Sequence, residues 1–224
     1  RFSFTRAIMG PGRGCPIVRA MLFDPCPLTG GTSRPPLDPP RATLRSALLA
    51  HEPSDEAEAR DREAMLALVA AEPGCFARTT FAPGHFTGSV FIFSEGTRHV
   101  LLHHHRRLQK WLQMGGHDEG ESDPAATALR EGREESGLDD LVLLSPRILD
   151  VDVHPIPPSA ARGEPGHAHF DVRYAAVTRS AGSERADAAE SLGLAWLPLE
   201  EAARRMGEPG ARRALANAAR LLGI

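Results

Sequence analysis

Apolar residues follow two spacings along the chain, and these spacings predict helices and strands in a mixed order. In residues 42–71, leucine, valine and alanine recur at helical spacing, with a break near Pro53. Helical spacing returns in residues 124–136, 200–205 and 211–222. β-Branched, aromatic or alternating runs predict strands in residues 88–94, 98–106, 111–114, 141–144, 148–154 and 167–177, and in a segment ending at Trp196 and Leu197. This order predicts an α/β fold in which one mixed sheet has helices on both faces.

The first 41 residues differ from the rest because proline and glycine punctuate them. Eight prolines lie between positions 11 and 40, together with Gly30 and Gly31. Such a stretch does not hold a regular element. Residues 1–41 are therefore predicted to form an N-terminal tail, and residues 42–224 the folded domain. The helical layer that opens the domain also offers a contact surface for a homodimer.

Composition argues against several classes of protein. The formal net charge of −3 leaves no basic field to hold a nucleic-acid polymer. The longest apolar runs, such as residues 89–93, are too short to cross a bilayer, and residues 1–10 lack the apolar run of a signal peptide. The three cysteines fit neither a disulfide framework nor a close-spaced zinc motif. We therefore expect reduced thiols in a cytoplasmic protein.

The clearest helix of the chain covers residues 124–136. Asp123 is a suitable N-cap, Pro124 suits the first helical position, and Gly137 suits the stop. Near its C-terminal end, Glu131, Glu134 and Glu135 stand at i, i+3 and i+4, which places them within one turn on one face. Three like charges so close together repel by a few tenths of a kcal/mol per pair, roughly, unless solvent or a cation screens them.

A cation is one explanation for this cluster. Carboxylate oxygens suit Mg²⁺, which keeps several waters and takes its other ligands from substrate phosphates. The Gly115-Gly116 turn before the helix permits a close approach of the backbone, so the carbonyl of Gly116 could complete the coordination. A solvated acidic face balanced by Arg130 and Arg133 explains the same glutamates. The fixed offsets of the glycine turn, the cap and the glycine stop favour the metal site.

The same stretch resembles the Nudix family. The Nudix box runs from a glycine, through five residues, a glutamate and seven residues, to Arg-Glu-apolar-x-Glu-Glu-x-Gly-apolar. At the matching spacing this chain has Gly116, Arg130, Glu131, Glu134, Glu135, Gly137 and Leu138. The resemblance implies a Nudix-type α/β/α sandwich. It also implies a Mg²⁺-dependent pyrophosphohydrolase acting on a nucleoside diphosphate linked to another group, as in a nucleoside triphosphate, a nucleotide sugar or a dinucleotide.

Two positions depart from the box. Its first glutamate falls on Ser122, with Glu121 one residue early. In the family that glutamate pairs mainly with the box arginine, so either Glu121 replaces it through a shift of the loop or Arg130 pairs elsewhere. The apolar position after Arg-Glu is Gly132, which costs about 1 kcal/mol of helix propensity relative to alanine. Neither departure removes an expected metal ligand.

The resemblance implies roles for the remaining residues of the box. Glu131, Glu134 and Glu135 would bind Mg²⁺, with Mn²⁺ as the alternative ion, and Arg130 would orient the carboxylates. The general base varies across the family: it is a glutamate of the box, such as Glu134 or Glu131, or one from a later loop. Outside the box, Glu190 is the first candidate and Glu184 the second.

Histidines near the glycine turn are candidates for contacts to the substrate. His103 and His105 share one face of a predicted strand that runs toward the turn, and His117 directly follows it. In the functional interpretation they line the pocket beside the diphosphate. A polar face or rim of the sheet is the alternative.

A second group of polar residues follows later strands. His167, His169 and Asp171 alternate with apolar residues, and His154 belongs to the strand before them. An amphipathic strand facing solvent explains this pattern, as do contacts to the non-reacting half of the substrate, for which His169 is the candidate. A second metal site is the third explanation, because two histidines and a carboxylate can coordinate a transition metal.

Two other functions are consistent with the same fold. A Nudix fold can sense a nucleotide without cleaving it, although degenerate glutamates would be expected in such a protein and are absent here. An isomerase acting on an isoprenoid diphosphate would need a cysteine close to the pocket. Cys75 precedes the first predicted strand and is poorly placed for that chemistry.

Overall fold

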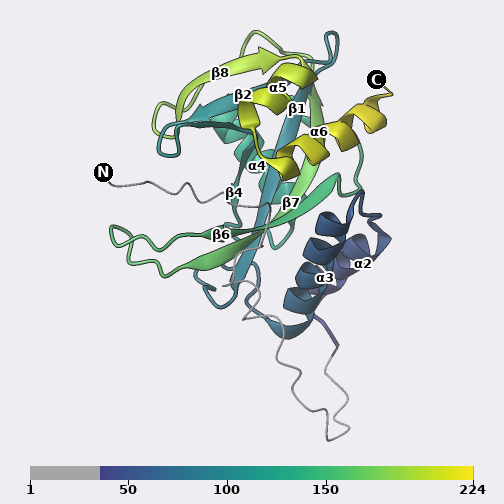
Figure 1. The fold of residues 1–224 in the computed structure, drawn as a ribbon, viewed down its shortest axis with the longest axis vertical. Helices are drawn as coiled ribbons and strands as arrows, with labels where there is room; N and C mark the ends of the chain where they lie inside the picture. Colours follow the sequence, from purple (N-terminus) through teal and green to yellow (C-terminus); the bar gives the residue numbers. More distant parts are fainter. Residues whose placement is uncertain (1–35, 224) are drawn as a thin grey trace, which may run out of the picture.

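A computed structural model describes residues 36–223 of the protein, so most of the predicted tail lies outside the described residues. Within this range the chain forms five helices and eight strands (Figure 1). The helices are α2 (Pro39–Ala50), α3 (Glu56–Ala71), α4 (Pro124–Ser136), α5 (Leu199–Met206) and α6 (Pro209–Leu222). The strands are β1 (Gly84–Ser94), β2 (Val100–His105), β3 (Lys110–Leu112), β4 (Met114–His117), β5 (Val142–Leu143), β6 (Asp150–Ile156), β7 (His167–Thr178) and β8 (Ser191–Leu197). The predicted α/β fold is confirmed.

All eight strands belong to one mixed sheet, and β1 is at its centre. Along one edge β1 pairs antiparallel with β2 and then with β4, and along the other it runs parallel to β7. The outer pairings are antiparallel: β3 and β8 with β2, and β5 and β6 with β7. Every residue of β1 is buried. Strand β1 therefore connects the part of the sheet that contains β2 and β4 with the part that contains β7.

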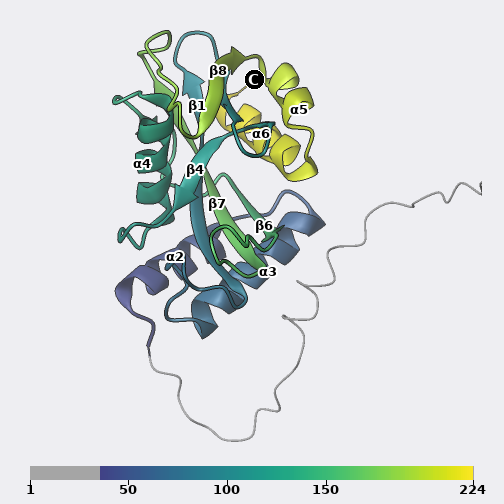
Figure 2. The same cartoon turned by 90° about the vertical axis from the view of Figure 1, so that its left-hand side faces the viewer.

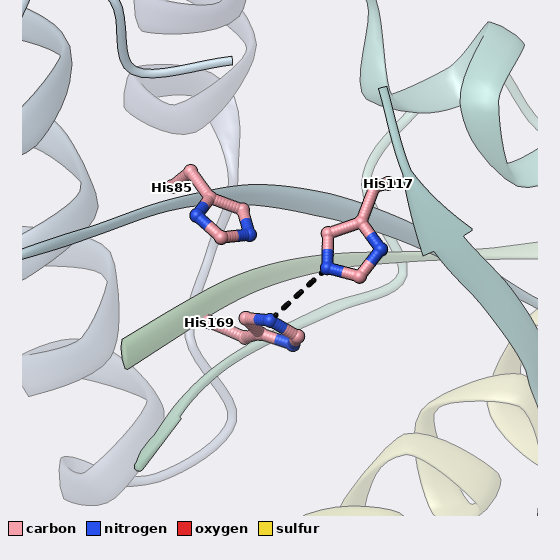
Figure 3. Close-up of side chains that lie close together, drawn as sticks. All are labelled: His85, His117 and His169. Atoms are coloured by element: carbon pink, nitrogen blue, oxygen red, sulfur yellow. Dashed lines mark hydrogen bonds between the residues drawn. The ribbon is translucent and has the colours of Figure 1, made fainter. Parts of the chain in front are cut away.

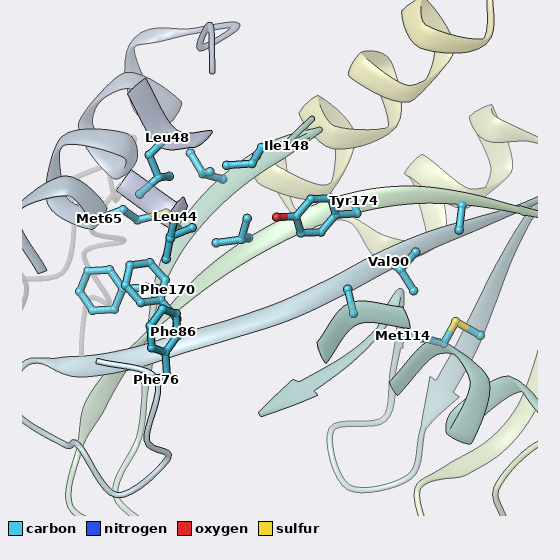
Figure 4. Close-up of a cluster of buried hydrophobic side chains, with 14 of the residues drawn as sticks. Leu44, Leu48, Met65, Phe76, Phe86, Val90, Met114, Ile148, Phe170 and Tyr174 are labelled. Atoms are coloured by element: carbon cyan, nitrogen blue, oxygen red, sulfur yellow. The ribbon is translucent and has the colours of Figure 1, made fainter. Parts of the chain in front are cut away.

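Helices cover both faces of this sheet, as predicted. Figure 2 shows α4 on one side and α5 with α6 on the other. One buried cluster joins α2, α3 and α4 to residues of β1 and β7 such as Phe86, Val90 and Phe170 (Figure 4). A second cluster joins α5 and α6 to Phe91 and Phe93 of the opposite face of β1. The two clusters hold α2, α3 and α4 against one face of the sheet, and α5 and α6 against the other.

The N-terminal helical layer begins earlier than the predicted boundary at Ala42. Asp38 caps α2 by accepting a hydrogen bond from the Arg41 N–H at 3.1 Å, and Pro39 occupies the first helical position. Proline is tolerated there because the first N–H groups of a helix have no partner within the helix. A break before Glu56 separates α2 from α3, as expected near Pro53. No helix within residues 36–223 is long and apolar enough to cross a membrane.

Candidate active site

Helix α4 occupies the residues that the sequence predicts, and its ends explain why. The Asp123 carboxylate accepts a hydrogen bond from the Ala125 N–H at 3.0 Å, and Pro124 follows at the first position. Gly137 ends the helix with a φ of 69°, in the left-handed region that favours glycine. These two ends fix which residues belong to the last turn, where Glu131, Glu134 and Glu135 lie.

Glycines let α4 pack unusually close to β1. A Cβ atom on Gly88 would lie 2.3 Å from the Pro124 carbonyl oxygen, so the strand has no room for a side chain there. A Cβ atom on Gly132 would lie 2.8 Å from Val90 Cγ1 and 3.0 Å from Leu141 Cδ1. The departure from an apolar residue at Gly132 is therefore explained by the narrow space between helix and sheet.

Two of the three glutamates rest against the glycine turn. A Cβ atom on Gly116 would lie 2.3 Å from Glu131 Oε1, so only glycine leaves space for this carboxylate. Glu135 accepts a hydrogen bond from the Gly115 N–H at 2.9 Å and is 7% exposed. The Glu134 side chain is more open, at 57% exposed. The structure thus brings the helix face and the turn together, as the sequence predicts.

Arg130 links the carboxylates to the loop that precedes the helix. Its guanidinium donates to Glu131 Oε1 and Glu134 Oε2, both at 3.0 Å, and to the His117 carbonyl at 2.6 Å. Its Nε donates to Glu121 Oε1 at 2.6 Å. Ser122 adopts a positive φ of 52°, which lets the loop bring Glu121 back toward the helix. Glu121 therefore takes the place of the missing box glutamate.

The electrostatics of the site favour a cation. Burial raises the pKa of Glu135 to about 8, and the charges of Glu131, Glu190 and Asp187 add to the effect. Burial also raises the pKa of Glu131, although Arg130 opposes the shift. Removing these carboxylates from water disfavours their charged forms unless an opposite charge is near. A divalent cation bound by oxygen ligands would supply that charge.

The domain that carries this helix matches a known family. A model of the NUDIX domain matches residues 85–218, which is more than half of the chain. This chain belongs to the Nudix family. The resemblance of the box is thereby confirmed, and membership of this family makes the protein a Nudix hydrolase acting on pyrophosphate bonds. Helices α2 and α3 precede the matched part.

Several solved structures are similar to this chain. An Ap4A hydrolase from C. elegans, in a binary complex, aligns with a TM-score of 0.50 and 20% identity over 62% of this chain and 98% of that chain. A dihydroneopterin triphosphate pyrophosphohydrolase from E. coli aligns with a TM-score of 0.48 and 20% identity, over 58% and 91% of the two chains. A NUDIX-family hydrolase from Clostridium perfringens has 29% identity and a TM-score of 0.43, over 62% and 96%. No curated protein matches the chain.

The histidines of β2 lie at different distances from the Nudix glutamates. His103 is 2% exposed, and its Nδ1 lies 3.7 Å from Glu135 Oε1. Burial, with smaller contributions from His105 and His104, lowers the pKa of His103 to about 4. His105 instead accepts hydrogen bonds from the N–H groups of Arg107 and Leu108, at 3.1 and 3.3 Å, and so holds the turn after β2. Only His103 of this pair lies directly against a box carboxylate.

His117 and His169 come together on the face of the sheet that carries Thr87. Their Nε2 atoms are 3.2 Å apart, and the ring of His85 lies about 5 Å from both, at 5.1 and 5.0 Å between centroids (Figure 3). Burial, followed by neighbouring charges, lowers the pKa of His117 to about 4 and that of His169 to about 2. His85 was not among the predicted site residues. The signal for it is the alternation of β1, which continues back to Gly84 although the prediction began at residue 88.

The polar face of β7 is largely buried, so the solvent-facing amphipathic strand, one of the three explanations of its pattern, is wrong. Asp171 is 3% exposed and accepts hydrogen bonds from the hydroxyls of Thr87 and Ser89, at 3.1 and 2.8 Å. Arg173 is 5% exposed and forms ion pairs with Asp171 and with Asp150 and Asp152 of β6. Sequence reasoning missed Arg173, because only the register between β6 and β7 brings these charges together.

The loop before β8 carries the two outside candidates for the general base. This loop lies beside the Nudix box, because the Arg185 N–H donates to the Ser136 carbonyl of α4 at 2.7 Å. The charges of Glu190 and Asp187 add to the effect of burial in raising the pKa of Glu135. The Glu190 side chain is exposed, and its backbone carbonyl accepts a hydrogen bond from the Arg106 N–H at 2.8 Å. Glu184 accepts from the Gly182 N–H at 2.7 Å and shapes its own turn.

Cys75 does not meet the requirement of an isomerase. It is fully buried in the core cluster beneath α2 and α3, and burial raises the pKa of its thiol to about 12. Cys15 and Cys26 lie outside the described residues.

Proposed function

We propose that this protein is a Mg²⁺-dependent hydrolase that cleaves a diphosphate bond in a nucleoside diphosphate linked to another group. The observation that carries the proposal is the convergence of Glu131 and Glu135 on the Gly115-Gly116 turn, with Arg130 bonded to both Glu131 and Glu134. A nucleoside triphosphate, a nucleotide sugar and a dinucleotide all contain such a bond. Membership of the Nudix family supports the type of reaction, whereas the choice of substrate and metal is our proposal.

The residues at the box fit a magnesium ion. The available donors are carboxylate oxygens and the carbonyl of Gly116, the hard oxygen ligands that Mg²⁺ prefers. Among the described residues, Glu135 has no arginine or lysine partner, so no cation opposes the burial that raises its pKa. Glu131, Glu134, Glu135 and Gly116 would hold the ion, with Mn²⁺ as the alternative. When bound, the metal polarises a phosphoryl oxygen and lowers the pKa of an attacking water.

The surrounding side chains position the reactants. Arg130 holds Glu131 and Glu134 in fixed orientations through charge-assisted hydrogen bonds, which are stronger than neutral ones. Glu190 would accept the proton of the attacking water from the loop beside Glu135, and a carboxylate of the box is the alternative base. His103, His105, His117 and His169 are proposed to line the substrate pocket, and the neutral rings of His103 and His117 suit hydrogen bonds rather than charge pairing.

A panel assay tests this proposal. Nucleoside triphosphates, nucleotide sugars and dinucleotides are incubated with the full chain and Mg²⁺ or Mn²⁺, and the phosphate products are measured. We expect turnover of at least one class, and a loss of about 100-fold or more in Glu134→Gln and Glu135→Gln. Glu63→Gln is the matched control, because that side chain is 68% exposed on α3, away from the box.

Two results would overturn the proposal. Equal rates in wild type, both box variants and the control would show that the glutamates do not act. Tight, metal-independent nucleotide binding without turnover would instead support a nucleotide-sensing protein. A cytoplasmic location and a homodimer through the α2–α3 layer are part of the same proposal; fractionation of the native cell and sedimentation of the purified chain test them.

A further inference from the structure

The histidine cluster on the opposite side of the glycine turn from the box glutamates is a site in its own right. We propose that His85, His117 and His169 bind one Zn²⁺ ion, or a similar divalent transition metal, and leave one coordination position open. The three residues come from β1, β4 and β7, and one nitrogen from each lies within 4.8 Å of the others. This inference does not depend on the proposed diphosphate hydrolysis.

The spacing of the ring nitrogens matches tetrahedral zinc. Zn–N bonds of 2.0–2.1 Å at tetrahedral angles place two ligand nitrogens about 3.3 Å apart. The Nε2 atoms of His117 and His169 are 3.2 Å apart. In Figure 3 the dashed line joins one nitrogen of each of these two rings, and one nitrogen of His85 points toward the same space. Three imidazoles so arranged can coordinate an ion with only small side-chain movements.

A buried lone pair on His85 is the second observation. Its Nδ1 lies 3.0 Å from the Thr80 carbonyl oxygen, which can only accept, so Nδ1 carries the proton. Nε2 then has a free lone pair, and among the described residues it has no hydrogen-bond partner although His85 is 0% exposed. Leaving such a group unsatisfied costs about 1–3 kcal/mol. A hydrogen bond between His117 and His169 would give a partner to one nitrogen of each of these rings and leave His85 Nε2 without one. A metal ion would give a partner to a nitrogen of all three rings.

The contact from Thr80 is also what a metal-binding histidine requires. A ligating imidazole typically donates its other N–H to a carbonyl or carboxylate, which fixes the tautomer and the orientation of the ring. Two further histidines surround the cluster. His167 stacks on His85 with its own Nδ1 at 2.9 Å from the Pro165 carbonyl, and His154 pairs with Asp152 at 2.9 Å. His167 and His154 are therefore neighbours of the three proposed ligands and not ligands themselves.

The chemistry of the donors selects the ion. Neutral imidazole suits zinc, copper, iron and nickel, whereas Mg²⁺ and Ca²⁺ prefer oxygen. Partial exposure of His117 and His169 gives the ion a route from solvent. The cluster adjoins the Nudix box along the chain, because Gly116 and His117 are consecutive on β4 and the His117 carbonyl accepts from Arg130. The open coordination position would take one further ligand. An anionic or carbonyl oxygen of a bound ligand would fit there.

Cobalt titration distinguishes this site from the carboxylate box. The full chain is stripped of metal, and Co²⁺ is added in excess Mg²⁺, which occupies oxygen ligands but competes poorly for imidazole. Wild type and Glu134→Gln should bind one Co²⁺ with the visible spectrum of a four-coordinate ion, and Zn²⁺ should displace it. His117→Gln and His169→Gln should weaken binding by about 100-fold or more, since even second-layer changes cost 10–100-fold. His99→Gln, in the turn before β2 and outside the cluster, should bind like wild type.

The outcomes separate the alternatives without relying on activity. If the histidine variants unfold, X-ray absorption of the zinc-loaded wild type counts the imidazole ligands directly, and three are expected. Absence of Co²⁺ binding in excess Mg²⁺ would overturn the proposal. So would binding that survives both histidine changes and disappears in Glu134→Gln, because the metal would then sit on the carboxylates.

Discussion

The absence of a side chain at Gly116 is as important to this site as the glutamate side chains. Gly116 lies against Glu131 so closely that a Cβ atom would come within 2.3 Å of the carboxylate oxygen. Real Cβ atoms do not tolerate such a contact, so any other residue would displace Glu131 from the turn. Because catalysis depends on placement to within about 1 Å, the glycine is as much a part of the site as the glutamate.

Gly116→Ala tests this dependence. We expect activity to fall by about 100-fold, since a displacement of about 1 Å has that effect, while the fold survives. Gly96→Ala is the matched control, because a Cβ atom at Gly96 meets nothing within 4 Å. Steady-state rates and thermal melting of both variants give the answer. Full activity in Gly116→Ala would mean that Glu131 is not needed at its observed position.

The side chain of Glu190 is the proposed general base, and its role can be tested by substitution. Glu190→Gln should lower kcat by roughly 100-fold or more if Glu190 accepts the proton, which is the usual contribution of general-base catalysis. Glu184→Gln serves as the comparison, because Glu184 binds its own turn at Gly182. Rates measured across pH for both variants decide between them. A larger loss in Glu184→Gln would reverse the assignment.

Helix α4 is held to the sheet by close packing rather than by helix propensity. Gly132 lowers the propensity of the helix by about 1 kcal/mol relative to alanine, yet it lets Val90 and Leu141 approach the backbone. The fold therefore accepts a weaker helix in return for a defined distance between its last turn and β4.

Gly132→Ala should consequently destabilise the protein despite the better helix former. Overpacking costs about 1–3 kcal/mol, and the propensity gain offsets about 1 kcal/mol, so the net loss centres on about 1 kcal/mol and we expect Tm to fall by roughly 2–4 °C. Gly193→Ala, where a Cβ atom has open space, should leave Tm nearly unchanged. A rise in Tm for Gly132→Ala would show that Val90 and Leu141 yield at low cost.

Glu58 ties α3 to the C-terminal layer and makes stability depend on pH. It is fully buried and accepts hydrogen bonds from His51 at 2.8 Å and the Ser54 N–H at 2.6 Å, with Arg213 of α6 at 3.7 Å. Burial raises the pKa of Glu58, but these partners outweigh burial and hold it at about 2 instead of 4.5. A lowered pKa stabilises the folded state above pH 4.5, and that stabilisation is lost as pH falls toward 2.

Chemical unfolding between pH 5 and pH 3 measures this contribution. Over that range wild type should lose on the order of 2 kcal/mol more of its free energy of unfolding than Glu58→Gln does. At pH 7 the variant should be less stable than wild type by about 2–4 kcal/mol, since a buried ion pair has lost one partner. The exposed Glu63→Gln should show neither effect. Parallel pH profiles for wild type and Glu58→Gln would contradict the assignment.

The bounds of some helices and strands could be predicted closely from the sequence. The bounds of others could not, because they depend on contacts between distant parts of the chain. The bounds of α4 match the prediction because its signals are local: a cap at Asp123 and a stop at Gly137. Strand β1 begins at Gly84 rather than residue 88, since its first residues alternate His, Phe and Thr and lack a continuous apolar run. The segment predicted at 111–114 is two strands, and only their different partners, β2 and β1, reveal the division.

The same distinction holds for the site. The box glutamates, Arg130 and the glycine turn could be found because their spacing along one helix fixes their geometry. The partnership of Glu121 with Arg130 was one of two alternatives, and the positive φ at Ser122 decides it. His85 and Arg173 depend on strand register, which pairs His85 with His169 across β1 and β7, and no local pattern contains that information.

Across the molecule, a buried network of charges connects the central strands to the C-terminal helix. Arg173 contacts Asp171, Asp150 and Asp152, and Asp150 also binds Arg213 of α6 at 2.7 Å. Buried charges of this kind are costly unless every member is paired. The network therefore couples β1, β6, β7 and α6 into one unit that includes the histidine-bearing face.

Asp171→Asn should weaken that unit. It leaves Arg173 short of one carboxylate and disturbs the bonds from Thr87 and Ser89, so we expect a loss of about 3 kcal/mol and a fall in Tm of roughly 6–12 °C. Asp139→Asn, at an exposed position, is the matched control. Calorimetry of the two variants is sufficient. An unchanged Tm in Asp171→Asn would mean that Asp150 and Asp152 alone satisfy Arg173.

The contact of α4 with β1 has a consequence for anyone who wishes to redesign this enzyme. Because Gly88 of β1 and Gly132 of α4 set the distance between helix and sheet, the loop at 157–166 can be exchanged without displacing the carboxylates. Grafting that loop from another member of the family would then be a way to change the substrate, whereas a graft that spans either glycine would be expected to abolish activity.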